Sequence, residues 1–229
     1  LSARDLDALA FLGTMGVAAQ YQLHIRCFAG RSEVVVSRCV QRLRRRKLVD
    51  VHRWNQTGIN LLRLTKEGRQ IVLETGGLPE SKLFVPKWPA PSALSHTLWI
   101  VDAVLALRAV APGFDIVPCW ALRRRFAGTE SPVPDVLAVS QDGMKLIAVE
   151  VDMGGENLRR VFAPKLETLV DALRSWAPEA SRAAVVLTTS ERRATAIEAL
   201  MSGGVTTRLL PRVIGRPAVA AIAEVLTRP

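Results

Sequence analysis

Two short apolar runs that carry acidic residues constrain the fold of this chain most strongly. Residues 133–140 and 144–151 are rich in Val, Ile, Leu and Ala, and an Asp-Gly turn joins them. This pattern predicts a β-hairpin. Because side chains alternate along a strand, Glu150 and Asp152 fall on one face, about 7 Å apart at ~3.3 Å per residue. Asp135 opens the neighbouring strand, so the hairpin predicts three carboxylates close together.

A cluster of carboxylates predicts a bound divalent cation. Like charges repel one another, and a hard cation with oxygen ligands relieves the repulsion. Asp135, Glu150 and Asp152 are therefore the candidate metal ligands, for Mg²⁺ or Mn²⁺. Lys165 follows Pro164, which suits the first position of a helix, so its ammonium is expected beside the sheet. These four charged residues are the candidate catalytic set for phosphodiester hydrolysis, because a metal activates water and an ammonium stabilises developing charge.

At these residues the chain resembles the PD-(D/E)xK nuclease superfamily. More narrowly, it resembles the replication-relaxation family, whose relatives include restriction-endonuclease-like mobilisation relaxases. The matching pieces are Pro134-Asp135, then Glu150-Val-Asp152 followed by Gly154-Gly155-Glu156, then Lys165-Leu166. Asp152 stands where the superfamily usually has its lysine. The resemblance therefore implies that Lys165 supplies the ammonium from the following helix.

Residues 1–75 predict a winged helix-turn-helix, which is a DNA-binding unit. Gly30 is suited to end its second helix, and Ser32 to cap its third. The expected elements are helices at 3–15, 18–28 and 33–47, strands at 48–53 and 60–64, and a closing helix at 64–72.

The outer side of the third helix predicts contacts with DNA. Four apolar residues recur at helical spacing as its buried side, namely Val36, Cys39, Val40 and Leu43. Between residues 31 and 53 there are eight Lys or Arg and two acids, so +6 of the formal net charge of +10 lies there. Basic and amide side chains hold phosphates and read base edges. The alternative interpretation of these cations is a solvated helix end, where positive charge suits the helix dipole. The candidate DNA-binding residues are Arg31, Ser37, Arg38, Gln41, Arg42, Arg45, Arg46 and Arg53.

The remainder predicts a linker and a second domain. Residues 76–92 contain four prolines and two glycines, which favours a connecting segment. Residues 93–229 are expected to form an α/β domain with a central mixed sheet. Its expected order is a helix at 93–110, a strand at 114–119, the hairpin, a helix at 164–176, a strand at 183–189, a helix at 191–202, a strand at 205–210 and a helix at 217–227. Helix, three strands, helix, strand is the order of the PD-(D/E)xK core, so the predicted fold class is α+β, a winged helix followed by a restriction-endonuclease-like domain.

Composition and absent motifs exclude several classes of protein. The apolar fraction of 49% allows a sizeable core. The three cysteines form no C-x-x-C pair and are odd in number, which argues against a zinc site and a disulfide framework and favours a reduced, cytoplasmic setting. No signal peptide and no apolar run approaching ~18 residues is evident, so no membrane span is expected. A Walker motif is absent, and the single tyrosine, Tyr21, is expected to pack within the N-terminal unit, which argues against helicase and tyrosine-relaxase chemistry.

The sequence thus predicts a protein that binds double-stranded DNA and acts as a magnesium-dependent endodeoxyribonuclease. The family resemblance implies nicking at a replication or transfer origin of a plasmid or integrative element. Because of Asp152, an alternative stays open, namely a catalytically inactive accessory factor for replication or mobilisation, or a transcriptional regulator, with the nuclease fold as a scaffold. Further partners, either a second copy of the chain or other replication and transfer proteins, also stay open.

Overall fold

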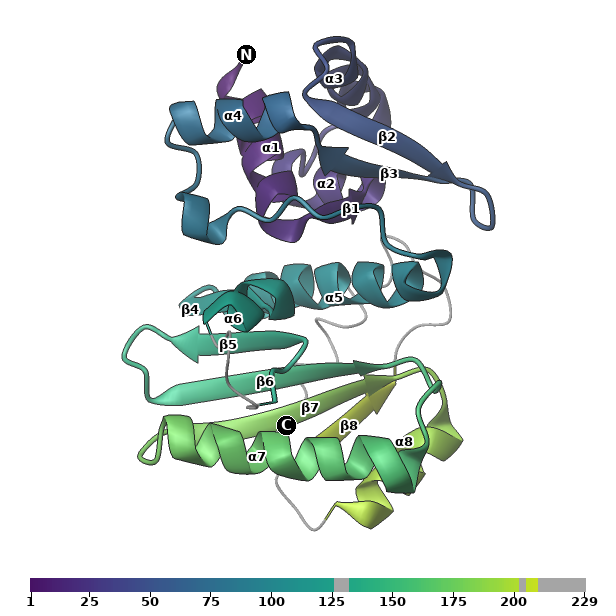
Figure 1. Cartoon of the computed structure of the whole chain (residues 1–229), viewed down its shortest axis with the longest axis vertical. Coiled ribbons are helices and arrows are strands. Elements are labelled where there is room, and N and C mark those ends of the chain that lie inside the picture. Colours follow the sequence, from purple (N-terminus) through teal and green to yellow (C-terminus); the bar gives the residue numbers. More distant parts are fainter. Residues whose placement is uncertain (126–131, 202–204, 210–229) are drawn as a thin grey trace. The chain divides into compact units, whose positions relative to one another are not determined.

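The computed structural model describes residues 1–125, 132–201 and 205–209 (Figure 1). The chain divides into two compact units, the first covering Leu1–Val101 and the second beginning at Asp102. Helices accompany a three-stranded sheet in the first unit and a five-stranded mixed sheet in the second, which confirms the α+β class. The predicted helix at 217–227 lies outside the described residues.

The first unit contains each element predicted for residues 1–75, with one addition. Its elements are α1 (Ala3–Met15), β1 (Val17–Ala19), α2 (Gln20–Cys27), α3 (Glu33–Arg45), β2 (Val49–Trp54), β3 (Ile59–Leu64) and α4 (Lys66–Glu74). The strands are antiparallel in the order β1-β3-β2. The sequence does not predict β1, because three buried residues are too few to show a strand period.

Capping and amphipathicity explain the two helices that matter most for function. Ser2 and Asp5 form a reciprocal capping box at the start of α1, as this pair of residue types favours. On α3 the buried residues are Val36, Cys39, Val40 and Leu43, as predicted. The opposite side of α3 is therefore exposed, and it carries polar and basic residues together with one exposed valine, Val34.

The segment after α4 is attached to the first unit. Leu83 is buried, and the backbone N–H of Phe84 donates to the carbonyl of Gly13 at 2.7 Å. Trp88 lies under the guanidinium of Arg63, which is 4.8 Å from the ring centroid. A short 3₁₀ turn, Glu80–Lys82, also forms in the segment predicted as a linker.

The long helix α5 (Pro91–Val110) contains the division between the two units. By length and composition it could cross a membrane, but 61% of its most apolar 18-residue window is buried inside the protein. The sequence analysis predicts this helix at 93–110 but no membrane span, because His96, Asp102 and Arg108 interrupt its apolar run.

The second unit is built on the sheet β4-β5-β6-β7-β8. Its strands are β4 (Phe114–Pro118), β5 (Val136–Ser140), β6 (Lys145–Asp152), β7 (Ser181–Thr188) and β8 (Val205–Leu209). The predicted hairpin is β5–β6, and β4 also pairs antiparallel with β5, whereas β6, β7 and β8 run parallel.

Helices join this sheet through the core. They are α6 (Cys119–Arg125), α7 (Ala163–Trp176) and α8 (Glu191–Leu200), and a π-helical turn η2 (Leu158–Phe162) leads into α7. The predicted apolar stripe of α7, with Leu166, Leu169 and Leu173, belongs to the core cluster that contains Leu146 of β6 and Val186 of β7. Figure 1 shows α7 lying along the sheet. The sequence does not predict α6, because a single helical turn or two is too short for periodicity.

Candidate nucleic-acid interface and acidic cluster

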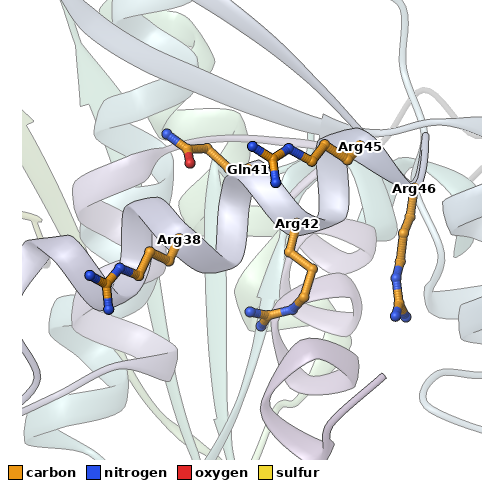
Figure 2. Close-up of a pocket in the computed structure, with 5 residues that line it drawn as sticks. All are labelled: Arg38, Gln41, Arg42, Arg45 and Arg46. Carbon is orange, nitrogen blue, oxygen red and sulfur yellow. The ribbon is translucent and has the colours of Figure 1, made fainter.

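The exposed side of α3 carries a basic hollow. A surface hollow of about 390 Å³ is lined by Arg38, Gln41, Arg42, Arg45 and Arg46. Figure 2 shows their side chains extending from successive turns of α3 and from its end. All five residues are exposed. The structure thus brings together five of the eight predicted DNA-binding residues on one surface.

The other three predicted residues lie outside this hollow. Arg31 and Arg53 are exposed, before α3 and on β2 respectively. Ser37 is half-buried, and its Oγ accepts a hydrogen bond from Nε2 of Gln20 at 2.9 Å. Oε1 of Gln20 in turn accepts from Nδ2 of Asn60 at 3.1 Å, so Ser37 ties α3 to α2 and β3.

A buried carboxylate that the sequence analysis does not single out holds Arg42. Asp5 of α1 is 2% exposed, and it accepts hydrogen bonds from the Ser2 backbone, from Sγ of Cys39 at 3.2 Å and from the Arg42 guanidinium. Burial alone would raise the pKa of Asp5, but the hydrogen bonds, that from Arg42 first, outweigh it and hold the pKa well below its usual range. Arg42 therefore neutralises a buried acid besides lining the hollow. No local spacing signals this contact, because it joins residues 37 positions apart.

In the second unit, the hairpin register brings two of the three predicted carboxylates together. Val136 pairs with Val149, so Asp135 and Glu150, the next residues outward, lie opposite each other. Both are buried, at 5% and 2% exposed. Oδ2 of Asp135 accepts the backbone N–H of Val151 at 2.9 Å, which fixes its position at the end of the hairpin.

Lys165 joins these two acids. Its Nζ donates to Oε2 of Glu150 at 2.8 Å. Burial would lower the pKa of Lys165, but the charges of Glu150 first, then Asp135 and Glu156, raise it above its ordinary value. The buried thiol of Cys119 lies near the same acids, and burial followed by the charge of Asp135 raises its pKa to about 12, so it stays protonated at neutral pH.

Asp152 is engaged elsewhere. Its Oδ2 accepts from Oγ1 of Thr188 at 3.0 Å and from Nε of Arg193, and its Oδ1 accepts from the Gly154 backbone and from Nη2 of Arg193. Arg193 also donates to the Glu156 carbonyl at 3.0 Å and lies over the Phe162 ring. Arg193 is absent from the residues predicted from sequence, because it comes from α8, 41 positions after Asp152.

These contacts change the argument for a metal ion. Within residues 1–125, 132–201 and 205–209, no three His, Cys, Asp or Glu side chains are grouped as metal ligands. Lys165 neutralises Glu150 and Arg193 neutralises Asp152, so the protein's own cations relieve much of the repulsion. Asp135 and Glu150 remain a pair of carboxylates that fits Mg²⁺, which is held by one or two carboxylates with several waters. Asp152, with four hydrogen bonds, does not fit as a third ligand in this arrangement.

Comparisons with known proteins identify a family. A family model described as replication-relaxation matches residues 7–185, which is most of the chain. The match covers both the basic hollow and the group formed by Asp135, Glu150 and Lys165. Neither the curated proteins nor the solved structures include a match.

Proposed function

Because the chain belongs to the replication-relaxation family, we propose that it binds double-stranded DNA in the replication of a plasmid or integrative element. The observation that carries this proposal is the hollow on α3, where four arginines and a glutamine meet solvent. Arginine binds phosphates and guanine edges, and glutamine can bind the adenine edge through two hydrogen bonds. In this proposal the first unit is a winged helix, with α3 as the recognition helix and β2–β3 as the wing.

Two further observations support a DNA ligand over another anion. The cationic residues of the hollow follow one helix over about two turns, and such an extent suits the major groove of a duplex more than a single phosphate group. Arg53, exposed at the outer end of β2, adds a cation on the proposed wing. The order of three helices followed by a hairpin also agrees with the winged helix predicted from sequence.

A second candidate function is favoured by the group at the end of the hairpin, namely metal-dependent nicking of DNA. The elements α5, β4, β5, β6, α7 and β7 follow one another in the order expected of a restriction-endonuclease-like core, with the short helix α6 inserted between β4 and β5 and the turn η2 before α7. Asp135 and Glu150 would hold Mg²⁺ or Mn²⁺, which supplies an activated water when bound. Lys165 would release Glu150 and stabilise negative charge on the phosphate.

A binding assay and a nicking assay test the two functions separately. Labelled duplex DNA and supercoiled plasmid carrying the element's origin are each mixed with the protein, with Mg²⁺, with Mn²⁺ and with a chelator. We expect Arg38→Ala with Arg45→Ala to reduce binding, and Asp135→Asn to abolish nicking while binding persists. Failure of wild-type protein to bind duplex DNA contradicts the proposed function. Binding without nicking under either metal favours the scaffold alternative.

A further inference from the structure

An exposed valine lies on the basic side of α3. Val34 is 56% exposed, whereas Val36, two positions later, is buried. The other exposed large hydrophobic side chains of the described residues, Leu1, Met144, Met153 and Val161, lie outside α3. Val34 is therefore an apolar group in surroundings that are otherwise polar and cationic.

The helical geometry aligns Val34 with three residues of the basic hollow. At about 100° per residue, positions 34, 38, 41 and 45 fall within an arc of roughly 60°. Val34 thus begins a stripe that continues with Arg38, Gln41 and Arg45. It stands in the first turn of α3, and in helix-turn-helix proteins the N-terminal residues of the recognition helix contact base edges.

We propose that Val34 is a specificity-determining residue that contacts the C5-methyl group of a thymine in the major groove. This inference rests on the proposed function and adds a base preference to it. Thymine is the base that presents an apolar group in that groove, and apolar side chains recognise it there. Without an apolar group to contact, an exposed valine among arginines has no advantage over a polar residue at the same position. The surface of one side chain is also much smaller than a protein–protein interface.

Arg38 and Gln41 extend the recognition. Arginine pairs with guanine through two hydrogen bonds, and glutamine pairs with adenine in the same way. The duplex that fits the stripe therefore contains a thymine close to a guanine and an adenine. Of the proposed contacts, the one with the thymine methyl can be removed by deleting a single methyl group from the DNA.

The test combines the Val34→Ala variant with replacement of thymine by deoxyuridine, which lacks the methyl group. A preferred duplex is selected from random sequences with the wild-type protein, and each thymine is then replaced in turn. We expect replacement at one position to weaken wild-type binding about fourfold, since a buried methyl-sized group is worth about that factor. The Val34→Ala protein should bind the two duplexes equally. Val161→Ala, a change at an exposed valine of the second unit, should retain the wild-type difference.

The outcomes separate this inference from the proposed function. If no duplex is bound, both are overturned. If duplex is bound but no deoxyuridine weakens binding, or if Val34→Ala shows the same loss as wild type, the role of Val34 is overturned and DNA binding stands. Loss of the difference in Val34→Ala alone supports it.

Discussion

The ammonium of Lys165 lies 2.8 Å from a carboxylate oxygen of Glu150, so α7 supplies the cation that neutralises a buried acid on β6. Two residues further along β6, the guanidinium of Arg193 from α8 neutralises Asp152. Neighbouring acids on one strand thus receive separate cations from two helices. Any metal bound by Asp135 and Glu150 has to compete with Lys165 for Glu150.

Removing the Lys165 ammonium is expected to destabilise the second unit. In Lys165→Met, the carboxylate of Glu150, 2% exposed, loses its charged partner. We expect a loss of about 1–3 kcal/mol in the free energy of unfolding. The loss stays below that of a fully buried pair because the Lys165 side chain is 39% exposed and water partly replaces it.

Urea unfolding of Lys165→Met and of a matched control measures this loss. Lys145→Met changes an exposed lysine on β6 and should leave the free energy of unfolding within about 0.5 kcal/mol of wild type. Combining Lys165→Met with Glu150→Gln should recover part of the stability, because the side chain left without the ammonium is then uncharged. Equal stability of Lys165→Met and wild type would contradict the importance of the pair.

Removing the Arg193 guanidinium is expected to lower the free energy of unfolding more than removing the Lys165 ammonium does. Asp152 and Arg193 have side chains that are 2% and 16% exposed, so water cannot easily replace the guanidinium. Arg193→Met should lower the free energy of unfolding by about 3–5 kcal/mol, the usual cost of leaving a buried charge alone. Arg192→Met, at the exposed neighbouring position, is the control.

Hydrogen exchange adds a local measurement for Arg193. The Gly154 N–H donates to Asp152, and Arg193 also binds the Glu156 carbonyl. Faster exchange at Gly154 is therefore expected in Arg193→Met and not in Arg192→Met. Unchanged protection of the Gly154 N–H would show that Arg193 does not fix the segment that follows β6.

The helices and strands of both units can be predicted from the sequence because apolar residues recur along them at helical or strand spacing. The apolar spacing of α3 and the Asp-Gly hairpin identify these elements without any long-range information. The opposition of Asp135 and Glu150 also follows from the sequence, since the turn of a hairpin sets its register. Pro164 predicts the helix start that places Lys165 beside the sheet, and the structure brings its ammonium to Glu150.

The partners of Asp152 and Arg42 could not be predicted. Arg193 and Asp5 reach them from other elements, and nothing in local spacing shows which distant charge faces a given acid. The metal prediction depended on unrelieved repulsion among three carboxylates. Tertiary ion pairs relieve it at two of them, which only the packing of α7 and α8 against the sheet can show.

Acid is expected to weaken the first unit through Asp5. The pKa of Asp5 is lowered in the folded state, so its contribution to stability is complete above the unfolded value of about 3.9 and is lost as the pH falls below it. Urea unfolding from about pH 7 down to about pH 3 should therefore show a steeper decline for wild type than for Asp5→Asn. Asp7→Asn removes a half-buried acid of the same helix, 3.7 Å from Arg26, and should follow the wild-type profile.

A close approach of two backbones is expected to make Gly68 intolerant of a side chain. A Cβ at Gly68 would lie 2.0 Å from the carbonyl oxygen of Leu48, so α4 would have to move away from Leu48, the residue before β2. Gly68→Ala should lower the free energy of unfolding by about 1–3 kcal/mol despite the better helix propensity of alanine. At Gly113 a Cβ meets nothing within 4 Å, so Gly113→Ala is the control, and equal stability of the two variants would exclude this clash.

The salt dependence of DNA binding tests whether the α3 arginines contact phosphates or bases. Each phosphate contact contributes about 0.9 to the slope of log affinity against log salt concentration. If Arg45 contacts a phosphate, Arg45→Ala should reduce the slope by about one and weaken binding to all sequences alike. If Arg38 reads a guanine, Arg38→Ala should instead reduce the preference for the selected duplex over an unrelated one.

Arg174→Ala is the control for both variants, since it changes an exposed arginine of α7 and should alter neither the salt slope nor the sequence preference. Arg42 is unsuited to this comparison, since Arg42→Ala would also leave Asp5 buried without its cation. Anisotropy titrations at several salt concentrations measure both quantities, and an unchanged slope and preference in both variants would remove α3 from the DNA interface.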